Sequence, residues 1–357
     1  MAKLALITDT HFGARNDNTA FADYFGKFYT EVFFPYLKEN NIDTIVHLGD
    51  IVDRRKYINY QTQAHMQQVF FDPIIKEGLN LHVIIGNHDT YYKNTNEVNS
   101  MQQLYGTTGH TNIKWYDNNP AVINFDGCDI MLLPWLCSNN IEPFLTEVKN
   151  TTAQVLFGHL ELKGFEMYKG AVNDHGFDSS LFNKFDIVCS GHFHHKSTVG
   201  NINYLGAPYE ITWSDFDDAR GFHIFDTDTR TIEFIRNPLT MFNKIHYDDS
   251  NATMEIVVNQ DYEKLRERYV KVIVREKTNP YWFDMFIERL EKVNPIHVQV
   301  VEDHFHLDLE DDEDIVSEAE DTMTILHKYI GALDVSIDKT KLETTIKDLY
   351  SEALSVS

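Results

Sequence analysis

Short apolar segments alternate with longer amphipathic ones along the first half of the chain, and this alternation narrows the possible folds. Six runs rich in Val, Ile and Leu have the length and composition of buried strands, namely Leu4–Thr8, Thr44–Leu48, Leu81–Ile85, Ile130–Leu133, Val155–Phe157 and Ile187–Ser190. Between the first three, Phe21–Asn40 and Thr62–Lys76 carry apolar residues near helical spacing. Strands that alternate with helices predict a layered α/β domain.

The pattern changes toward the C-terminus. Shorter runs with turn signals at Ile202–Leu205, Gly221–Phe225 and Ile232–Ile235 predict an antiparallel edge to the sheet. Further on, Val270–Val274, Pro280–Val293 and Ile296–Val300 predict a strand, a helix and a strand, with a proline at the helix start. We therefore expect a main domain over residues 1–245 and a small α/β unit over 246–301.

Negative charge is concentrated in one segment of this 357-residue chain. Fifty-five acidic residues against 31 basic ones give a net charge of -24, and eleven of the acids lie between Glu302 and Asp321 without any Lys or Arg. Such a composition favours a solvated linker over 302–321. Beyond it, Met323–Ile330 and Leu342–Leu354 have helical spacing, so residues 322–357 are expected to form helices that pack in their own domain or on a partner chain.

The number and spacing of the cysteines, together with the hydropathy of the chain, indicate the cellular compartment in which the protein is expected. The three cysteines form no Cys-x-x-Cys pair, which excludes a disulfide scaffold and a cysteine-built zinc site and favours a reducing environment. No apolar run approaches the ~18 residues of a membrane span, and the N-terminal apolar stretch is too short for a signal peptide. We therefore expect a cytoplasmic protein.

Five of the predicted strands run directly into residues that can bind metal. In chain order these clusters are Asp9-Thr10-His11, Gly49-Asp50-Ile51-Val52-Asp53, Gly86-Asn87-His88-Asp89, Gly158-His159 and Gly191-His192-Phe193-His194. One Asp after a strand is usually a turn or a helix cap, and one buried His is usually a hydrogen-bonded core residue. Five clusters at strand ends are different, because ligands of layered α/β sheets bind at the carboxyl ends of strands.

Spacing and donor type specify the kind of site. The Asp-x-His and His-x-His spacings put both side chains on one face of an extended segment. Glycines precede four of the five clusters, and we expect them to permit sharp turns. All donors are oxygen or nitrogen, which favours manganese, iron or zinc. The set holds more donors than one ion needs, and Asp50, in the middle, could bridge two.

A pair of divalent ions is especially suited to clamping a phosphoryl group while activating water. His88 follows Asn87 immediately, so its side chain should point away from the ligand direction and be free to protonate the leaving oxygen. Asp89 could orient the His88 imidazole. The residues alone therefore predict a two-metal phosphoesterase.

In this order the motifs resemble the calcineurin-like metallophosphoesterase superfamily, and within it the SbcD-type nuclease subunits of double-strand-break repair complexes. The sequence at 158–170, 190–194 and 204–213 is similar to the recombination endonuclease subunits of T-even-type bacteriophages. The resemblance implies an α/β fold, a layered metallophosphoesterase sandwich of mixed sheets flanked by helices, with a small α/β capping domain and C-terminal helices.

The resemblance also implies roles for single residues. One metal would be held by Asp9, His11, Asp50 and His194, and the other by Asp50, Asn87, His159 and His192. Manganese is the expected ion, with magnesium, iron or zinc as alternatives. His88 would be the acid or would stabilise the transition state. Some relatives have a second His three residues after the bridging Asp, where this chain has Asp53, so we expect Asp53 to orient a ligand or a neighbouring base.

Partners are implied in the same way. The unit at 246–301 would cap the site and help to place DNA, and the candidate phosphate contacts are Arg54, Arg55, Lys93, Lys271 and Arg275. An SMC-like coiled-coil ATPase of the SbcC type would bind the C-terminal helices. A homodimer is expected, with the helices near 21–40 and 62–76 as candidate surfaces.

Two functions remain open at this point. The first is a manganese-dependent DNA exonuclease and endonuclease of recombination and double-strand-break processing. The second is a small-substrate phosphatase or cyclic-nucleotide phosphodiesterase of the same fold, which the metal core alone does not exclude. Residues 246–357 favour the first, since a stand-alone phosphatase needs no cap, acidic linker or terminal helices. A non-catalytic scaffold is disfavoured because every ligand position is filled.

Overall fold

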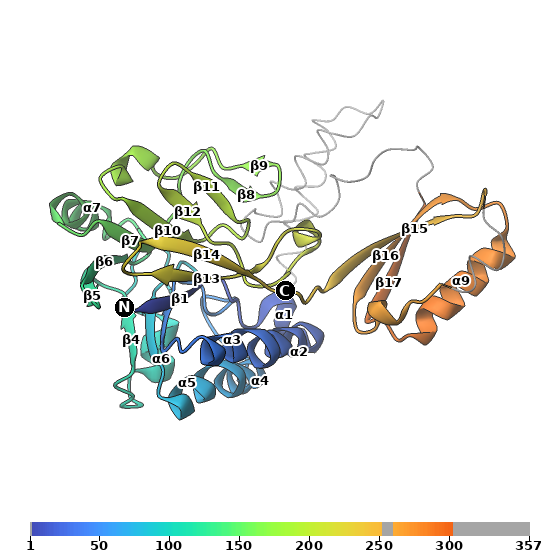
Figure 1. Cartoon of the computed structure of the whole chain (residues 1–357), viewed down its shortest axis with the longest axis horizontal. Coiled ribbons are helices and arrows are strands. Elements are labelled where there is room, and N and C mark those ends of the chain that lie inside the picture. The colour runs from blue at the N-terminus through green and yellow to red at the C-terminus, as the bar shows by residue number, and fades with distance from the viewer. Residues whose placement is uncertain (1, 252–259, 303–357) are drawn as a thin grey trace, which may run out of the picture. The chain divides into compact units, whose positions relative to one another are not determined.

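The structure is a computed structural model that describes residues 2–251 and 260–302 (Figure 1). The predicted acidic linker beyond residue 302 and both C-terminal helices lie outside the described residues. Within the described ranges, no helix has the length and apolar character needed to cross a membrane.

Two six-stranded sheets form the main part of the described chain. The first has the order β14 (Thr231–Arg236), β13 (Gly221–Asp226), β1 (Lys3–Ile7), β2 (Thr44–His47), β3 (Asn80–Ile84) and β4 (Ile113–Tyr116). The second has the order β11 (Ser197–Val199), β12 (Ile202–Tyr204), β10 (Ile187–Gly191), β7 (Val155–His159), β6 (Cys128–Leu133) and β5 (Ala121–Phe125). A two-stranded hairpin, β8 (Glu166–Tyr168) and β9 (Ala171–Val172), follows β7.

Strand pairing confirms most of the predicted topology. Strands β1 to β4 run parallel, and β13 and β14 add an antiparallel edge beside β1. The prediction for Ile202–Leu205 was wrong, because β12 belongs to the second sheet, where it pairs in parallel with β10 and antiparallel only with β11. A run as short as Ile202–Leu205 does not indicate which sheet the strand will join.

Helices cover the outer faces of both sheets. They are α1 (Ala14–Asp17), α2 (Thr19–Lys27), α3 (Phe34–Glu39), α4 (Tyr60–Met66), α5 (Asp72–Glu77), α6 (Ser100–Tyr105) and α7 (Ile141–Asn150), with short 3₁₀ turns at Ser179–Phe182, Trp213–Asp215 and Glu263–Leu265. Figure 1 shows α2 to α5 gathered on one side of the sheets and α7 on the other.

Each of the two long predicted helices is interrupted by a wider π-helical turn, Phe28–Phe33 in one and Gln67–Phe71 in the other. Both turns end just before a proline, Pro35 or Pro73. Proline has no N–H and its ring crowds the carbonyl four residues earlier. The hydrogen bonding therefore shifts to a five-residue spacing, as in the bond from Phe34 N to Tyr29 O.

The core is layered because alternate residues of each strand face opposite sides. Leu4 and Leu6 of β1 lie in an apolar cluster shared with Leu132 of β6 and Phe157 of β7, so the two sheets pack face to face. Ala5 and Ile7 face the aromatic side chains of the helices instead. Strands buried on both faces read as continuous apolar runs, which is why the sequence revealed them.

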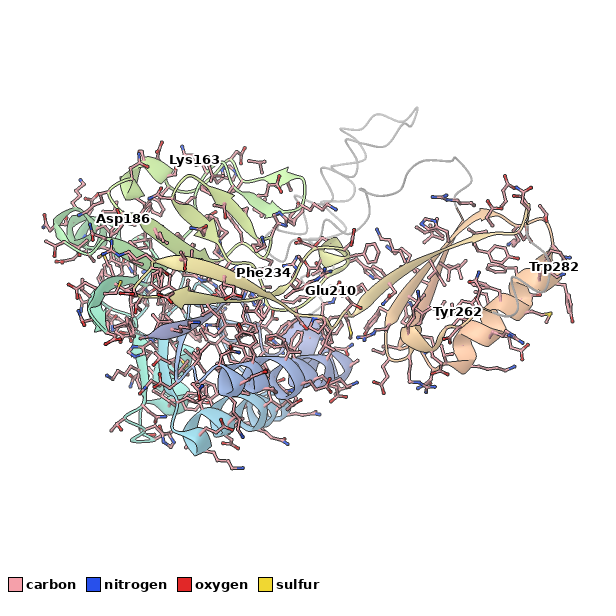
Figure 2. The ribbon with its side chains drawn as sticks, in the orientation of Figure 1. Lys163, Asp186, Glu210, Phe234, Tyr262 and Trp282 are labelled. Carbon is pink, nitrogen blue, oxygen red and sulfur yellow. The ribbon has the colours of Figure 1, made fainter. Side chains whose placement is uncertain are left out.

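A third sheet lies in the C-terminal part of the described chain. It consists of β15 (Phe242–Asp248), β16 (Tyr269–Glu276) and β17 (His297–Glu302), all parallel, with α9 (Pro280–Lys292) between the last two. These strands and α9 have their own apolar cluster, which includes Tyr262 (Figure 2). The Tyr262 ring packs on Phe286 with 5.7 Å between ring centroids. The predicted strand, helix and strand are confirmed, whereas β15 was missed.

Candidate active site

The candidate site forms where strand ends from both large sheets meet. Asp9 and His11 follow β1, Asp50 and Asp53 follow β2, and Asn87 to Asp89 follow β3 in the first sheet. His159 ends β7, and His192 and His194 follow β10 in the second sheet. All the predicted ligands are therefore brought to one place.

One donor cluster contains Asp9, His11 and His194, whose ligand atoms lie within 4.8 Å of one another. The two imidazoles face each other, with 3.0 Å between His11 Nε2 and His194 Nε2. His11 Nε2 also lies 3.9 Å from Asp50 Oδ2. These contacts join the end of β1 to the loop after β10.

A second donor cluster contains Asp50, His159 and His192, again within 4.8 Å. Asn87 Oδ1 lies 2.9 Å from both His159 Nε2 and His192 Nδ1. His159 Nε2 is 3.3 Å from Asp50 Oδ2, and His159 Nδ1 donates to the Leu48 carbonyl at 2.7 Å. That bond directs the Nε2 lone pair into the cluster. Asp50 approaches both clusters.

In each cluster the carboxylates stabilise a positive charge on one imidazole, whereas burial lowers the pKa of the other, to about 3 for His192 and well below its usual value for His194. Burial opposes a charged imidazole, yet the carboxylates of Asp53, Asp50 and Asp9 raise the pKa of His11 to about 9. Asp50 likewise raises the pKa of His159 to about 9 against the effect of burial. A buried site that stabilises cations and offers only oxygen and nitrogen donors fits divalent metal ions.

Several of these residues have a strained backbone. Asp9, His11, Asp50 and His192 have φ angles of 52°, 41°, 56° and 87°, in the left-handed region that side chains other than glycine rarely adopt. Each such residue costs on the order of 1–3 kcal/mol. Strain of this size at four residues of one site points to a functional constraint.

The glycines before the clusters serve close packing more than turning. Only Gly49, with φ of 104°, has the left-handed backbone that the turn prediction requires. At Gly86 an added Cβ would lie 2.3 Å from Asp50 Oδ1, and at Gly191 it would lie 2.0 Å from Thr8 Oγ1. The turn prediction was therefore wrong for Gly86, Gly158 and Gly191. Gly158 lies inside β7, and the missing Cβ at Gly86 and Gly191 lets neighbouring segments approach.

His88 lies beside the first cluster, edge-on to the His11 ring with 4.8 Å between centroids. Its Nδ1 is bonded to the backbone carbonyl of Asp53, and its backbone N–H donates to Asp50 Oδ1 at 2.7 Å. A carbonyl only accepts, so Nδ1 carries the proton and Nε2 is the reactive nitrogen. The Asp53 carboxylate lies 3.5 Å from His11 Nδ1.

We had expected Asp89 to orient the His88 imidazole, and this expectation was wrong. Its carboxylate is buried and accepts hydrogen bonds from the backbone N–H groups of Asp50, Ile51, Val52 and Gly86 and from Ser100 Oγ. Burial and the charge of Asp50 raise the pKa of Asp89 to about 6. Asp89 therefore holds the loops after β2 and β3 together.

Sequence reasoning missed a second supporting group, centred on Arg220. This buried guanidinium is bonded to the backbone carbonyl of His194 and to the carboxylates of Asp215 and Asp218, at 2.6 and 2.8 Å. Asp218 also accepts from His195 Nδ1 at 2.8 Å. Because Arg220 lies twenty-six residues after His194, no local sequence pattern predicts this contact.

The candidate DNA contacts differ in their surroundings. Arg54 is engaged by the Asp17 carboxylate and lies 4.8 Å from the Tyr57 ring. Arg55 is half-buried near Asp50, and its Nη1 has no hydrogen-bond partner among the described residues. Lys93 and Arg275 are exposed, and Lys271 Nζ lies 4.6 Å from the Trp213 ring centroid.

Comparison with known proteins agrees with this geometry. Residues 2–196, which include all five clusters, match the family model described as calcineurin-like phosphoesterase. The chain belongs to this family.

Two individual proteins are similar to the chain to very different degrees. This calcineurin-like chain is 35% identical over 320 residues to exonuclease subunit 1 of Enterobacteria phage T4, covering 89% of this chain and 90% of that one. A solved archaeal phosphodiesterase has 12% identity and a TM-score of 0.33, covering 66% of this chain and 99% of that chain. The predicted family and the layered metallophosphoesterase fold are confirmed.

Proposed function

We propose that the chain is a two-metal-dependent DNA phosphodiesterase with exonuclease and endonuclease activity. The observation that carries this proposal is the pair of neighbouring donor clusters. Asp50 belongs to one of them and lies 3.9 Å from His11 of the other, and His88 lies beside them. The relative named exonuclease subunit 1 supports DNA over a small ester as the substrate.

The proposed chemistry divides between bound cations and the chain. Divalent ions, when bound, supply Lewis acidity toward the phosphoryl oxygens and toward water. Asp9, His11, Asp50 and His194 would hold one ion, and the other would be held by Asp50, Asn87, His159 and His192. The oxygen and nitrogen donors fit manganese, iron or zinc, and manganese is our preferred ion because the resemblance to SbcD-type nucleases implies it.

His88 is proposed to move the proton. Its Nδ1–H is held by the Asp53 carbonyl, so Nε2 is the nitrogen that exchanges a proton, and the imidazolium form of His88 would give its Nε2 proton to the departing oxygen. The Asp53 carboxylate would orient His11 across their 3.5 Å contact. Arg55 is our preferred phosphate contact, since its Nη1 is buried without a partner in the described part of the chain.

The remaining parts are proposed to serve DNA and partners. The unit at 246–301 would cap the site, and residues 302–321 would link it to helices at 322–357 that bind an SMC-like coiled-coil ATPase. The relative's description as a subunit supports a partner chain. We also propose a homodimer, which a sedimentation mass near that of one chain at micromolar concentration would refute.

The test is cleavage of end-labelled linear DNA by the full chain with manganese, beside hydrolysis of bis(4-nitrophenyl) phosphate. We expect EDTA to stop the reaction, and His88→Ala to abolish DNA cleavage while calorimetry still shows metal binding. His175→Ala, which changes an exposed histidine outside the clusters, is the matched control.

Two results would contradict the proposal. Full activity of His88→Ala would remove its assigned role. Turnover of the small ester with DNA untouched, even with the ATPase present, would favour the alternative, a small-substrate phosphatase or cyclic-nucleotide phosphodiesterase.

A further inference from the structure

The loop that leaves His88 presents two aromatic rings to solvent. Tyr91 and Tyr92 have 40% and 50% of their surface exposed. Their rings meet edge to face, with 4.7 Å between centroids and an interplanar angle of 74°. Other tyrosines of this chain, such as Tyr57 and Tyr60, are more exposed. What distinguishes Tyr91 and Tyr92 is that two adjacent rings lie on the loop that follows His88.

This loop is held by buried polar contacts. Tyr91 N donates to Val98 O at 2.8 Å, which closes the loop on itself. Asn96, only 2% exposed, donates from Nδ2 to the carbonyls of Asp117 and Trp135 at 3.1 and 2.9 Å. The backbone that carries the two tyrosines is therefore fixed to the segments that follow β4 and β6.

The position of the loop places the rings close to the reacting centre. Tyr91 is three residues after His88, so the chain separates their Cα atoms by at most about 11 Å. Asn96 also ties the loop to Trp135, whose ring lies 5.1 Å from the ring of the donor His192. At about 3.4 Å per nucleotide along a strand, the separation between Tyr91 and His88 corresponds to about three nucleotides from a phosphate held beside His88.

We propose that Tyr91 and Tyr92 stack on unpaired nucleobases next to the scissile phosphate, so that the chain acts on DNA ends whose terminal bases are single-stranded. This inference rests on the proposed DNA phosphodiesterase function. Aromatic rings bind bases of any sequence through their faces, and paired bases inside a duplex keep those faces covered. Stacking also suits a chain with net charge -24, which has little positive charge for phosphates. Lys93 adds one exposed cation to the same loop.

The binding test uses an oligonucleotide with 2-aminopurine at an unpaired end, mixed with the full chain in EDTA so that nothing is cut. We expect the wild-type chain to quench the fluorescence and Tyr91→Ala/Tyr92→Ala to lose the quenching. Tyr91→Phe/Tyr92→Phe, which keeps both rings, should retain it. Glu97→Gln, which changes an exposed side chain of the same loop, should also retain it.

A cleavage test uses ends that differ only in their bases. The double alanine variant should lower kcat/KM on frayed ends by roughly 5- to 150-fold, with little change on the small ester. Abasic sites at those end positions should weaken cleavage by the wild type but not by the variant, because both changes remove the same contact.

Two outcomes overturn the stacking site. One is unchanged quenching in the double alanine variant. The other is an equal loss on frayed DNA, blunt DNA and the small ester, which indicates a structural role. If the wild type quenches the probe but cuts no DNA, the proposed function fails and the stacking site stands. If it cuts DNA without quenching, only the stacking site fails.

Discussion

Gly191→Ala is expected to damage both the fold and the metal site. The added Cβ would lie 2.0 Å from Thr8 Oγ1, 2.9 Å from Leu48 O and 3.0 Å from Asp9 Oδ2. Leu48 O belongs to the backbone, so it yields less readily than the threonine hydroxyl. The hydroxyl donates to Asp9 Oδ2 at 2.7 Å, and moving it would displace a proposed ligand.

The size of the effect follows from two terms. Overpacking in a filled interior costs about 1–3 kcal/mol. Loss of the Thr8 hydrogen bond to a charged group adds about 1.5–3 kcal/mol. Gly191→Ala should therefore lower the free energy of unfolding by about 2.5–6 kcal/mol. Thr8→Ala alone should cost only the second term. The double variant should cost less than the two single effects combined, by at least about 1.5–3 kcal/mol, because the hydrogen bond is lost only once. The difference should be larger if removing the hydroxyl also gives the new methyl group room.

Urea denaturation in EDTA measures the free energy of unfolding of wild type, the two single variants and the double variant. Calorimetric titration with manganese measures metal binding. We expect Gly191→Ala to weaken metal binding by about 10- to 100-fold, as changes in groups supporting a ligand do. Effects of the two substitutions that add within about 0.5 kcal/mol would refute the reasoning, because the structure requires the methyl group and the hydroxyl to compete for one space.

Three further predictions address other parts of the structure. Asp89→Ala removes the acceptor of four buried backbone N–H groups and should lower the free energy of unfolding by on the order of 5 kcal/mol. A variant as stable as wild type but slower would instead mean that Asp89 acts through His88. Burial raises the pKa of Glu210, which accepts from Phe242 N (Figure 2), to about 7 from 4.5. Between these pH values the folded chain keeps a proton that the unfolded chain has lost, so stability falls as pH rises. In urea denaturation, the free energy of unfolding of wild type should fall by on the order of 3 kcal/mol relative to Glu210→Gln as the pH rises from 4.5 to about 7. A difference between the two proteins that does not change with pH would contradict this. Arg55→Ala should raise KM for DNA about tenfold, whereas Arg54→Ala, whose guanidinium is already in an ion pair, should change it little. Equal effects would argue against a phosphate contact at Arg55.

Local patterns were sufficient for most of the strands and for the candidate ligands. The first strand, Lys3–Ile7, is buried on both faces and therefore reads as a short apolar run. The change from such a run to Asp, His or Asn marks the point where a strand ends and a polar site begins. The helical spacing at 21–40 was equally visible, although proline shifts its hydrogen bonding to a π turn at Phe28–Phe33.

Tertiary structure decided what lies between these segments. Nothing in the sequence separates β1, β2 and β3 from β7 and β10, yet they belong to different sheets, and the donor clusters exist because those sheets pack face to face. The same packing gives Gly191 its role, since the atom it must avoid is 183 positions away at Thr8. It also placed Asp89 on backbone amides and Arg220 on the His194 carbonyl. Strand periodicity and polar ends are properties of neighbouring residues, whereas these contacts join residues far apart in the chain and depend on how whole sheets fill space.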